Sequence, residues 1–240
     1  MNLRPLLWLL GAAVAALALW IAVVAWQDAH SSRGPMARAV LPDTPWFEAA
    51  PYSHPQRPGL AVANPACPQP QVTGDGDPPL QTNVPEGISR FDVSQGRLDA
   101  LAGFSVDARV LSRREYSGDR PALFSPLDLA LGWGPMTDGA ALAQLNIRQS
   151  GRWYRYSWSG NPPLDPAVII RSSANMHMIP SSPAIAKALD ELRKDDRVRI
   201  DGWLVEAHDR DGWNWRSSLT REDSGGGACE VVYVCGVTRF

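Results

Sequence analysis

SPAIAKALDELRKDDRVRIDGWLV, residues 182–205, carries a helix signal followed at once by a strand signal. Ser182 suits a helix N-cap, Pro183 suits the first helical position, and the apolar residues that follow recur at the spacing of one helix face. Over residues 197–206 apolar and polar residues then alternate, as in a strand that covers a core on one face. The stretch therefore predicts a helix over residues 182–193 that leads through a tight turn into a strand.

Further strand patterns lie on both sides of this stretch, separated by Gly, Ser, Asn and Pro turns. Strands are expected over residues 104–110, 127–133, 145–149, 153–158, 167–170, 213–219 and 228–237. The last of these is almost continuously apolar, which predicts a strand covered on both faces. A short helix is also expected over residues 92–101.

Many short strands with one amphipathic helix predict a β-rich (α+β) soluble domain. Its architecture is expected to be a small, partly open β-barrel, OB-like, or a sandwich. The helix followed directly by a strand has an OB-like character, but OB-folds are defined by strand topology, which the sequence does not show, so the alternatives stay open.

Ahead of the domain, LLWLLGAAVAALALWIAVVAW, residues 6–26, contains no charged residue. As a helix, this run of about 21 residues would be about 31 Å long, close to the ~30 Å hydrocarbon core of a bilayer. A cleaved signal peptide is the alternative, but the run is long for one and Trp26 stands where a small residue is expected. The sequence therefore predicts a single-pass transmembrane helix that binds the chain to a membrane.

Between the helix and the domain, residues 34–85 hold 12 of the chain's 21 prolines. Proline fixes φ and removes a hydrogen-bond donor, so this part predicts an extended spacer. The predicted organisation is a short cytoplasmic tail over residues 1–5, a transmembrane helix over 6–26, a Pro-rich spacer over 27–85 and the β-rich domain over 86–240. The short tail favours a soluble domain outside the cytoplasm, periplasmic in a bacterium and held at the inner membrane.

The chain has a formal net charge of −2, and its sequence contains no block of basic residues, so nucleic acid is not expected as a partner. Three cysteines, Cys67, Cys229 and Cys235, lack zinc-binding spacing, and no metal site or cofactor is predicted. Cys229 and Cys235 are expected on one strand, too far apart to bond each other. One of them could pair with Cys67, although two buried thiols and one exposed thiol are favoured.

Two stretches are hard to explain as scaffold, RSSANMHMIP at residues 171–180 and DGWNWRSSLTREDSGGGACE at residues 211–230. His177, beside Asn175, is the histidine best placed for a general base or a ligand-binding role, because His titrates nearest neutral pH. The alternative is a structural histidine bonded to a backbone carbonyl.

A nucleophile for His177 could come from the serines of the two stretches, with Asp223 or Glu230 orienting the histidine. The candidate serines are Ser172, Ser173, Ser217 and Ser218. No G-x-S-x-G elbow is present, so a serine hydrolase is an alternative and not the leading hypothesis.

Trp213 and Trp215 are two residues apart on an expected strand and so face the same side. With Arg216 and Arg221 they could form a stacking platform for a glycan or another small ligand. The alternative is a pair of core tryptophans beneath the helix over residues 182–193.

The motifs SSANMHMIP and GWNWRSSLTREDSGGGACE resemble a signature of uncharacterised bacterial membrane-anchored proteins. The resemblance covers residues 103–237 and implies a bacterial source and the domain boundary, but no activity. The leading functional hypothesis is a non-catalytic module that binds an envelope protein or helps build an envelope assembly. The chain is more readily explained as a binding protein than as an enzyme.

Overall fold

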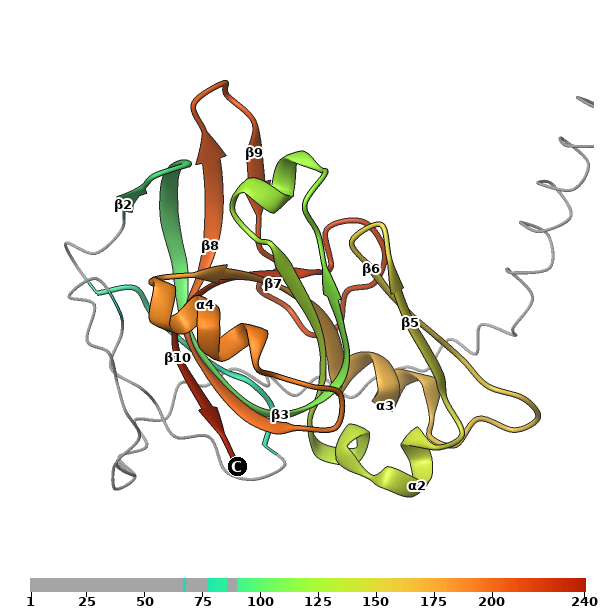
Figure 1. Cartoon of the computed structure of the whole chain (residues 1–240). Coiled ribbons are helices and arrows are strands. Elements are labelled where there is room, and N and C mark those ends of the chain that lie inside the picture. The colour runs from blue at the N-terminus through green and yellow to red at the C-terminus, as the bar shows by residue number, and fades with distance from the viewer. Residues whose placement is uncertain (1–66, 68–76, 86–89) are drawn as a thin grey trace, which may run out of the picture. The chain divides into compact units, whose positions relative to one another are not determined.

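The computed structural model describes residue 67, residues 77–85 and residues 90–240 (Figure 1). The expected transmembrane helix over residues 6–26 and most of the expected spacer lie outside the described residues. Within the described part of the chain, no helix is both long enough and apolar enough to cross a bilayer.

The described chain is β-rich with few helices. The large sheet contains β1 (Leu80–Thr82), β2 (Arg90–Val93), β3 (Gly96–Glu115), β4 (Leu127–Gly132), β7 (Ser173–Pro180), β8 (Arg197–Asp209), β9 (Asn214–Arg216) and β10 (Glu230–Arg239). A separate hairpin is formed by β5 (Asn146–Ser150) and β6 (Trp153–Ser157). The helical segments are η1 (Arg120–Leu123), η2 (Gly134–Thr137), α2 (Gly139–Leu142), α3 (Pro166–Arg171) and α4 (Pro183–Asp190).

The large sheet is partly ring-like, because its pairings return to the strand on which they begin. β3 pairs with β4, β4 with β7, β7 with β10, β10 with β8, and β8 with β3. β7 and β10 run parallel, whereas the other four pairs of this ring are antiparallel. β3 has 20 residues, with one register shift between Ala100 and Ala102 in its pairing with β8 and another between Val110 and Ser112 in its pairing with β4. Such irregularities bend a strand and increase its twist, as a curved sheet requires.

The main core is built from the alternate residues of the ring strands. Leu129 of β4, Met176 of β7, Ile200 of β8 and Val232 of β10 are all buried in one cluster. Helix α4 adds Ile185 to the same cluster. Ser182 caps this helix by accepting a hydrogen bond from the backbone N–H of Ile185, as expected from the sequence.

The opposite faces of β4, β7 and β10 are also covered, so these strands are buried on both sides. Ala130 packs in a cluster with residues of the β5–β6 hairpin, and Val231 packs in a cluster with Trp213 and Trp215. The expected doubly covered strand is therefore confirmed, but with shifted bounds: β10 begins at Glu230 instead of residue 228, and only its first six residues are buried. Because of this second layer, polar residues such as Asp128 and His177 are buried outside the main core.

Gly202 interrupts the apolar alternation of β8 for a steric reason. A Cβ atom at this position would lie 2.0 Å from the backbone carbonyl oxygen of Tyr233 on β10. Only glycine allows the two strands to approach this closely without displacing the backbone.

Cys67 and Cys235 form a disulfide that links the segment before β1 to the last strand. The favoured expectation of free thiols was wrong for this pair, because Cys235 lies on the face of β10 that packs with Cys67. Cys229, which precedes β10, is a free thiol. β1 lies within the expected spacer and pairs with β3, so sheet structure begins before residue 86.

Two local expectations were wrong. Residues 92–101 form the β2–β3 hairpin instead of a short helix, and Leu98 is buried there as a strand residue. Residues 167–170 lie in helix α3 instead of a strand. The overlooked signal is Asp165-Pro166, because the Asp165 side chain caps the helix and proline occupies its first turn.

Candidate functional site

A buried charged cluster, called here the Asp128 cluster, lies on the outer face of β4 and β7. It consists of Asp128, Arg152, Asn175 and His177. Asp128 Oδ1 lies 2.7 Å from Arg152 Nη1 and 2.9 Å from His177 Nδ1, and the contact with His177 does not have hydrogen-bond geometry. Asn175 Nδ2 donates to the second oxygen, Asp128 Oδ2, at 3.2 Å. The carboxylate is fully buried and has a cationic partner, as a buried charge requires.

Arg152 reaches this position from the two-residue turn of the β5–β6 hairpin. Its φ is 69°, and that of the preceding Gly151 is 56°, so both turn residues have positive φ, as in a type I′ turn. A positive φ is uncommon for a residue with a side chain. The side chain is held by Asp128 and by Asp119, whose two carboxylate oxygens each accept a hydrogen bond from it at 2.8 Å. These contacts hold the hairpin against β4.

Aromatic rings complete the surroundings of the Asp128 cluster. The ring of Trp215 lies 4.3 Å from the ring of His177, and the guanidinium of Arg152 lies 3.9 Å from the ring centre of Tyr116. Burial lowers the pKa of Arg152, but its contacts with Asp119 and Asp128 outweigh burial, so this pKa lies above its ordinary value. The Asp128 cluster is thus an ion-pair network between the hairpin and the ring, and Trp215 of β9 packs against it.

Ser217 and Ser218, two of the predicted catalytic serines, make their hydrogen bonds with groups other than His177. The hydroxyl of Ser217 donates to the backbone carbonyl of Ser218, and that of Ser218 donates to Asp223 Oδ2 at 2.6 Å. Ser172 is buried at the end of α3. Within the described part of the chain, no hydrogen bond joins His177 to Ser172, Ser217 or Ser218.

Trp213 and Trp215 lie on the same side, as expected, but they are half-buried and do not pack beneath α4. Trp213 stacks on Phe124 and has Arg120 near its ring, whereas Trp215 contacts His177. Arg216 points to the other side of β9 and forms an ion pair with Glu206. The two tryptophan side chains therefore cover the outer face of the ring of strands instead of forming an open platform.

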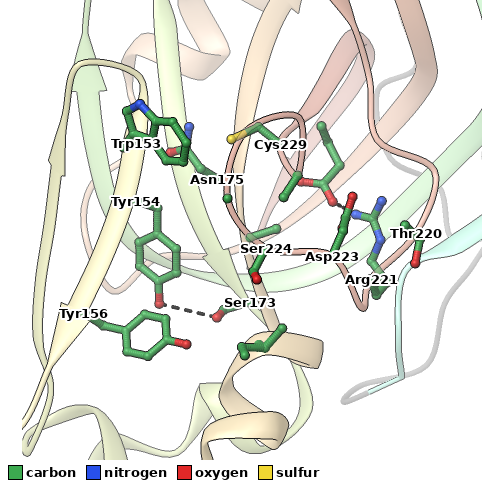
Figure 2. Close-up of a pocket in the computed structure, with 15 residues that line it drawn as sticks. Trp153, Tyr154, Tyr156, Ser173, Asn175, Thr220, Arg221, Asp223, Ser224 and Cys229 are labelled. Atoms are coloured by element: carbon green, nitrogen blue, oxygen red, sulfur yellow. Dashed lines mark hydrogen bonds and ion pairs between the residues drawn. The ribbon is translucent and has the colours of Figure 1, made fainter. Parts of the chain in front are cut away.

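A pocket of about 120 Å³, called here the aromatic pocket, lies beside the Asp128 cluster (Figure 2). One wall is formed by Trp153, Tyr154 and Tyr156 of β6. The opposite wall is formed by the loop before β10, and Ser173 and Asn175 of β7 lie between the two walls in this view. The hydroxyl of Tyr154 donates to Ser173 Oγ at 3.4 Å, which ties the aromatic wall to β7.

The loop wall contains an ion pair between Arg221 and Glu230, two of the residues singled out in the sequence. Their side chains are 9 % and 1 % exposed. Burial lowers the pKa of Arg221 to about 10, and the nearby Asp223 partly opposes this shift. The other hydrogen-bonding atoms, Arg221 Nε and Nη2 and Glu230 Oε2, are buried and have no hydrogen-bond partner among the described residues.

Cys229 also lines the aromatic pocket, but its thiol is not activated. Burial, together with the negative charge of Asp128, raises its pKa to about 11. A nucleophilic cysteine needs a thiolate and therefore a lowered pKa.

No group of three or more residues suited to binding a metal ion occurs in the described ranges.

Sequence reasoning missed Asp128, Arg152 and the three aromatic residues of β6. It identified six other residues of this region: Ser173, Asn175, His177, Arg221, Asp223 and Glu230. The segment WYRYSW, residues 153–158, offered a usable signal, because it places Tyr154 and Tyr156 on one face of a strand. Asp128 offered none, because one acidic residue in an apolar strand does not indicate which cation reaches it.

The Asp119–Arg152 pair makes stability depend on pH. The hydrogen bond from Arg152 holds the pKa of Asp119 below its ordinary 3.8, against a smaller opposing effect of burial. A lowered folded-state pKa stabilises the protein above about pH 4, and this contribution is lost as the pH falls through the lowered value. We expect Asp119→Asn to reduce the free energy of unfolding more at pH 6 than at pH 3 in urea denaturation. An equal reduction at both pH values would contradict the assignment.

No protein-family model, no curated protein and no solved structure matches this chain.

Proposed function

We propose that this chain is a non-catalytic binding module, tethered to the bacterial inner membrane through residues 6–26, with its β-rich domain outside the cytoplasm. The observation that carries the proposal is the aromatic pocket, in which buried hydrogen-bonding groups of Arg221 and Glu230 remain unused. Such groups cost free energy while they are unpaired, so a partner that pairs with them would gain affinity. The expected partner is an envelope component.

The contacts of His177 support a binding role over hydrolysis. A hydrolase would need His177 beside a serine hydroxyl in an open cleft. The described contacts of His177 are instead to Asp128 and Trp215, and its side chain is 3 % exposed.

We also propose that the ring is an OB-type barrel. Three features support this proposal. The strand order is β3-β4-β7-β10-β8, and the pair β7–β10 is parallel. Helix α4 lies between β7 and β8, the third and fourth ring strands along the chain. OB-folds bind ligands over their second and third strands and the adjoining loops. The aromatic pocket involves the third strand, β7, and the loop before β10.

The disulfide between Cys67 and Cys235 supports the proposed location. Disulfides form and persist in oxidising compartments such as the periplasm and are rare in the cytosol.

Photocrosslinking in native membranes tests the binding role. A photoreactive amino acid at Trp153, on the rim of the pocket, should give a discrete crosslinked product in the full-length protein. The same amino acid at Lys187, which is exposed on α4, serves as the matched control and should not give that product. Equal crosslinking patterns at the two positions, or none at either, would contradict a binding site in the pocket.

A further inference from the structure

Two charged side chains that line the aromatic pocket, Arg221 and Glu230, carry buried donors and a buried acceptor without a partner among the described residues. Arg221 Nε and Nη2 can donate and Glu230 Oε2 can accept, and all three atoms are buried without a partner in the described structure. An unsatisfied buried group costs about 1–3 kcal/mol. The pocket is therefore chemically prepared for a ligand that can accept from one side chain and donate to the other.

The charges in the pocket favour an uncharged ligand. Arg221 and Glu230 already neutralise each other in direct contact, and Asp223 accepts the hydroxyl of Ser218. A charged ligand would add an uncompensated charge to this buried, already neutral pair, and burying an unpaired charge is costly. A hydroxyl group accepts and donates at once, so it can bond both side chains without disturbing their charge balance.

The opposite wall determines the shape of the ligand. Trp153, which is 40 % exposed, and the two tyrosines of β6 offer aromatic surface facing the Arg221 side of the pocket (Figure 2). Aromatic faces give large apolar contact area to a flat or ring-shaped ligand. The volume of about 120 Å³ is small compared with the 300–1,000 Å³ typical of sites for drug-sized ligands, so the pocket suits one ring and not a chain of rings.

We propose that the aromatic pocket binds a neutral sugar ring, with one face on Tyr154 and Tyr156, an edge against Trp153 at the rim, and hydroxyl groups bonded to Arg221 and Glu230. This inference rests on the proposed binding function and names its ligand class. The ring could be a free monosaccharide or the terminal unit of a glycan, because the exposed rim leaves room for a linkage to solvent.

Saturation-transfer NMR on the purified full-length chain in detergent tests the inference, with glucose, galactose and N-acetylglucosamine as neutral probes. Glutamate and putrescine are the charged probes of similar size. We expect transfer to the ring protons of at least one sugar and none to the charged probes. Transfer to no sugar, or stronger transfer to a charged probe, would overturn the sugar assignment.

Variants locate the site. Trp153→Ala should weaken sugar binding at least tenfold, whereas Phe240→Ala, which removes another exposed aromatic ring outside the pocket, should leave binding unchanged. Glu230→Gln should also weaken binding. If this substitution of a buried residue prevents folding, Trp153→Ala still tests the site independently. Unchanged binding in Trp153→Ala would place the sugar elsewhere. A partner crosslinked at residue 153 without any sugar binding would refute this inference but not the proposed function.

Discussion

Replacing Asp128 by alanine is expected to lower the free energy of unfolding by about 3–5 kcal/mol, the cost of removing one partner from a buried ion pair. The carboxylate has Arg152, Asn175 and His177 within 3.2 Å, and it is fully buried. Without it, the guanidinium of Arg152 keeps Asp119 but loses its buried partner. For a domain of this size the melting temperature should fall by about 6–20 °C.

The matched control is Asp119→Ala, which removes the more exposed carboxylate from the same arginine. Its effect should be clearly smaller, because partly exposed ion pairs are worth about 0–1 kcal/mol. Thermal unfolding followed by circular dichroism measures both variants. Equal losses in the two variants would show that the Asp128 cluster is not the main connection between the hairpin and β4.

Removing the disulfide is expected to cost a similar amount. Cys67 and Cys235 are separated by 168 residues, so the bridge restricts a long loop of the unfolded chain. Removing a native disulfide from a small secreted domain lowers stability by about 2–5 kcal/mol. Cys235→Ser should therefore shift the urea midpoint to a clearly lower concentration under oxidising conditions.

The free cysteine supplies the control for this experiment. Cys229→Ser should leave the midpoint sensitive to reducing agent, whereas Cys235→Ser should make it insensitive. If reducing agent does not change the midpoint of the unmodified protein, the bridge does not contribute to stability.

Local sequence signals predicted many of the elements but not their assembly. Helix α4 follows from its cap and its apolar spacing, and β10 follows from its continuous apolar run. In both cases the information is contained in neighbouring residues. The pairing of β8 with β3, which closes the ring, was not predictable, because pairing between strands about 100 residues apart leaves no local pattern.

The candidate site shows the same division. Arg221 and Glu230 stood out as charged residues in a stretch poorly explained as scaffold, and the structure brings them together. Arg152 did not stand out, since its importance depends on a turn that directs it toward Asp128 and Asp119. Polar residues that are far apart in the sequence, as these are, come into contact only in the folded chain.

The bridge between Cys67 and Cys235 also determines how mechanical load enters the domain. A pull applied to the chain before Cys67 passes through the covalent bridge into β10, which is held between β7 and β8. The short strand β1 pairs only through three residues and would otherwise be peeled first. With the bridge intact, the load reaches a strand that is hydrogen-bonded on both sides.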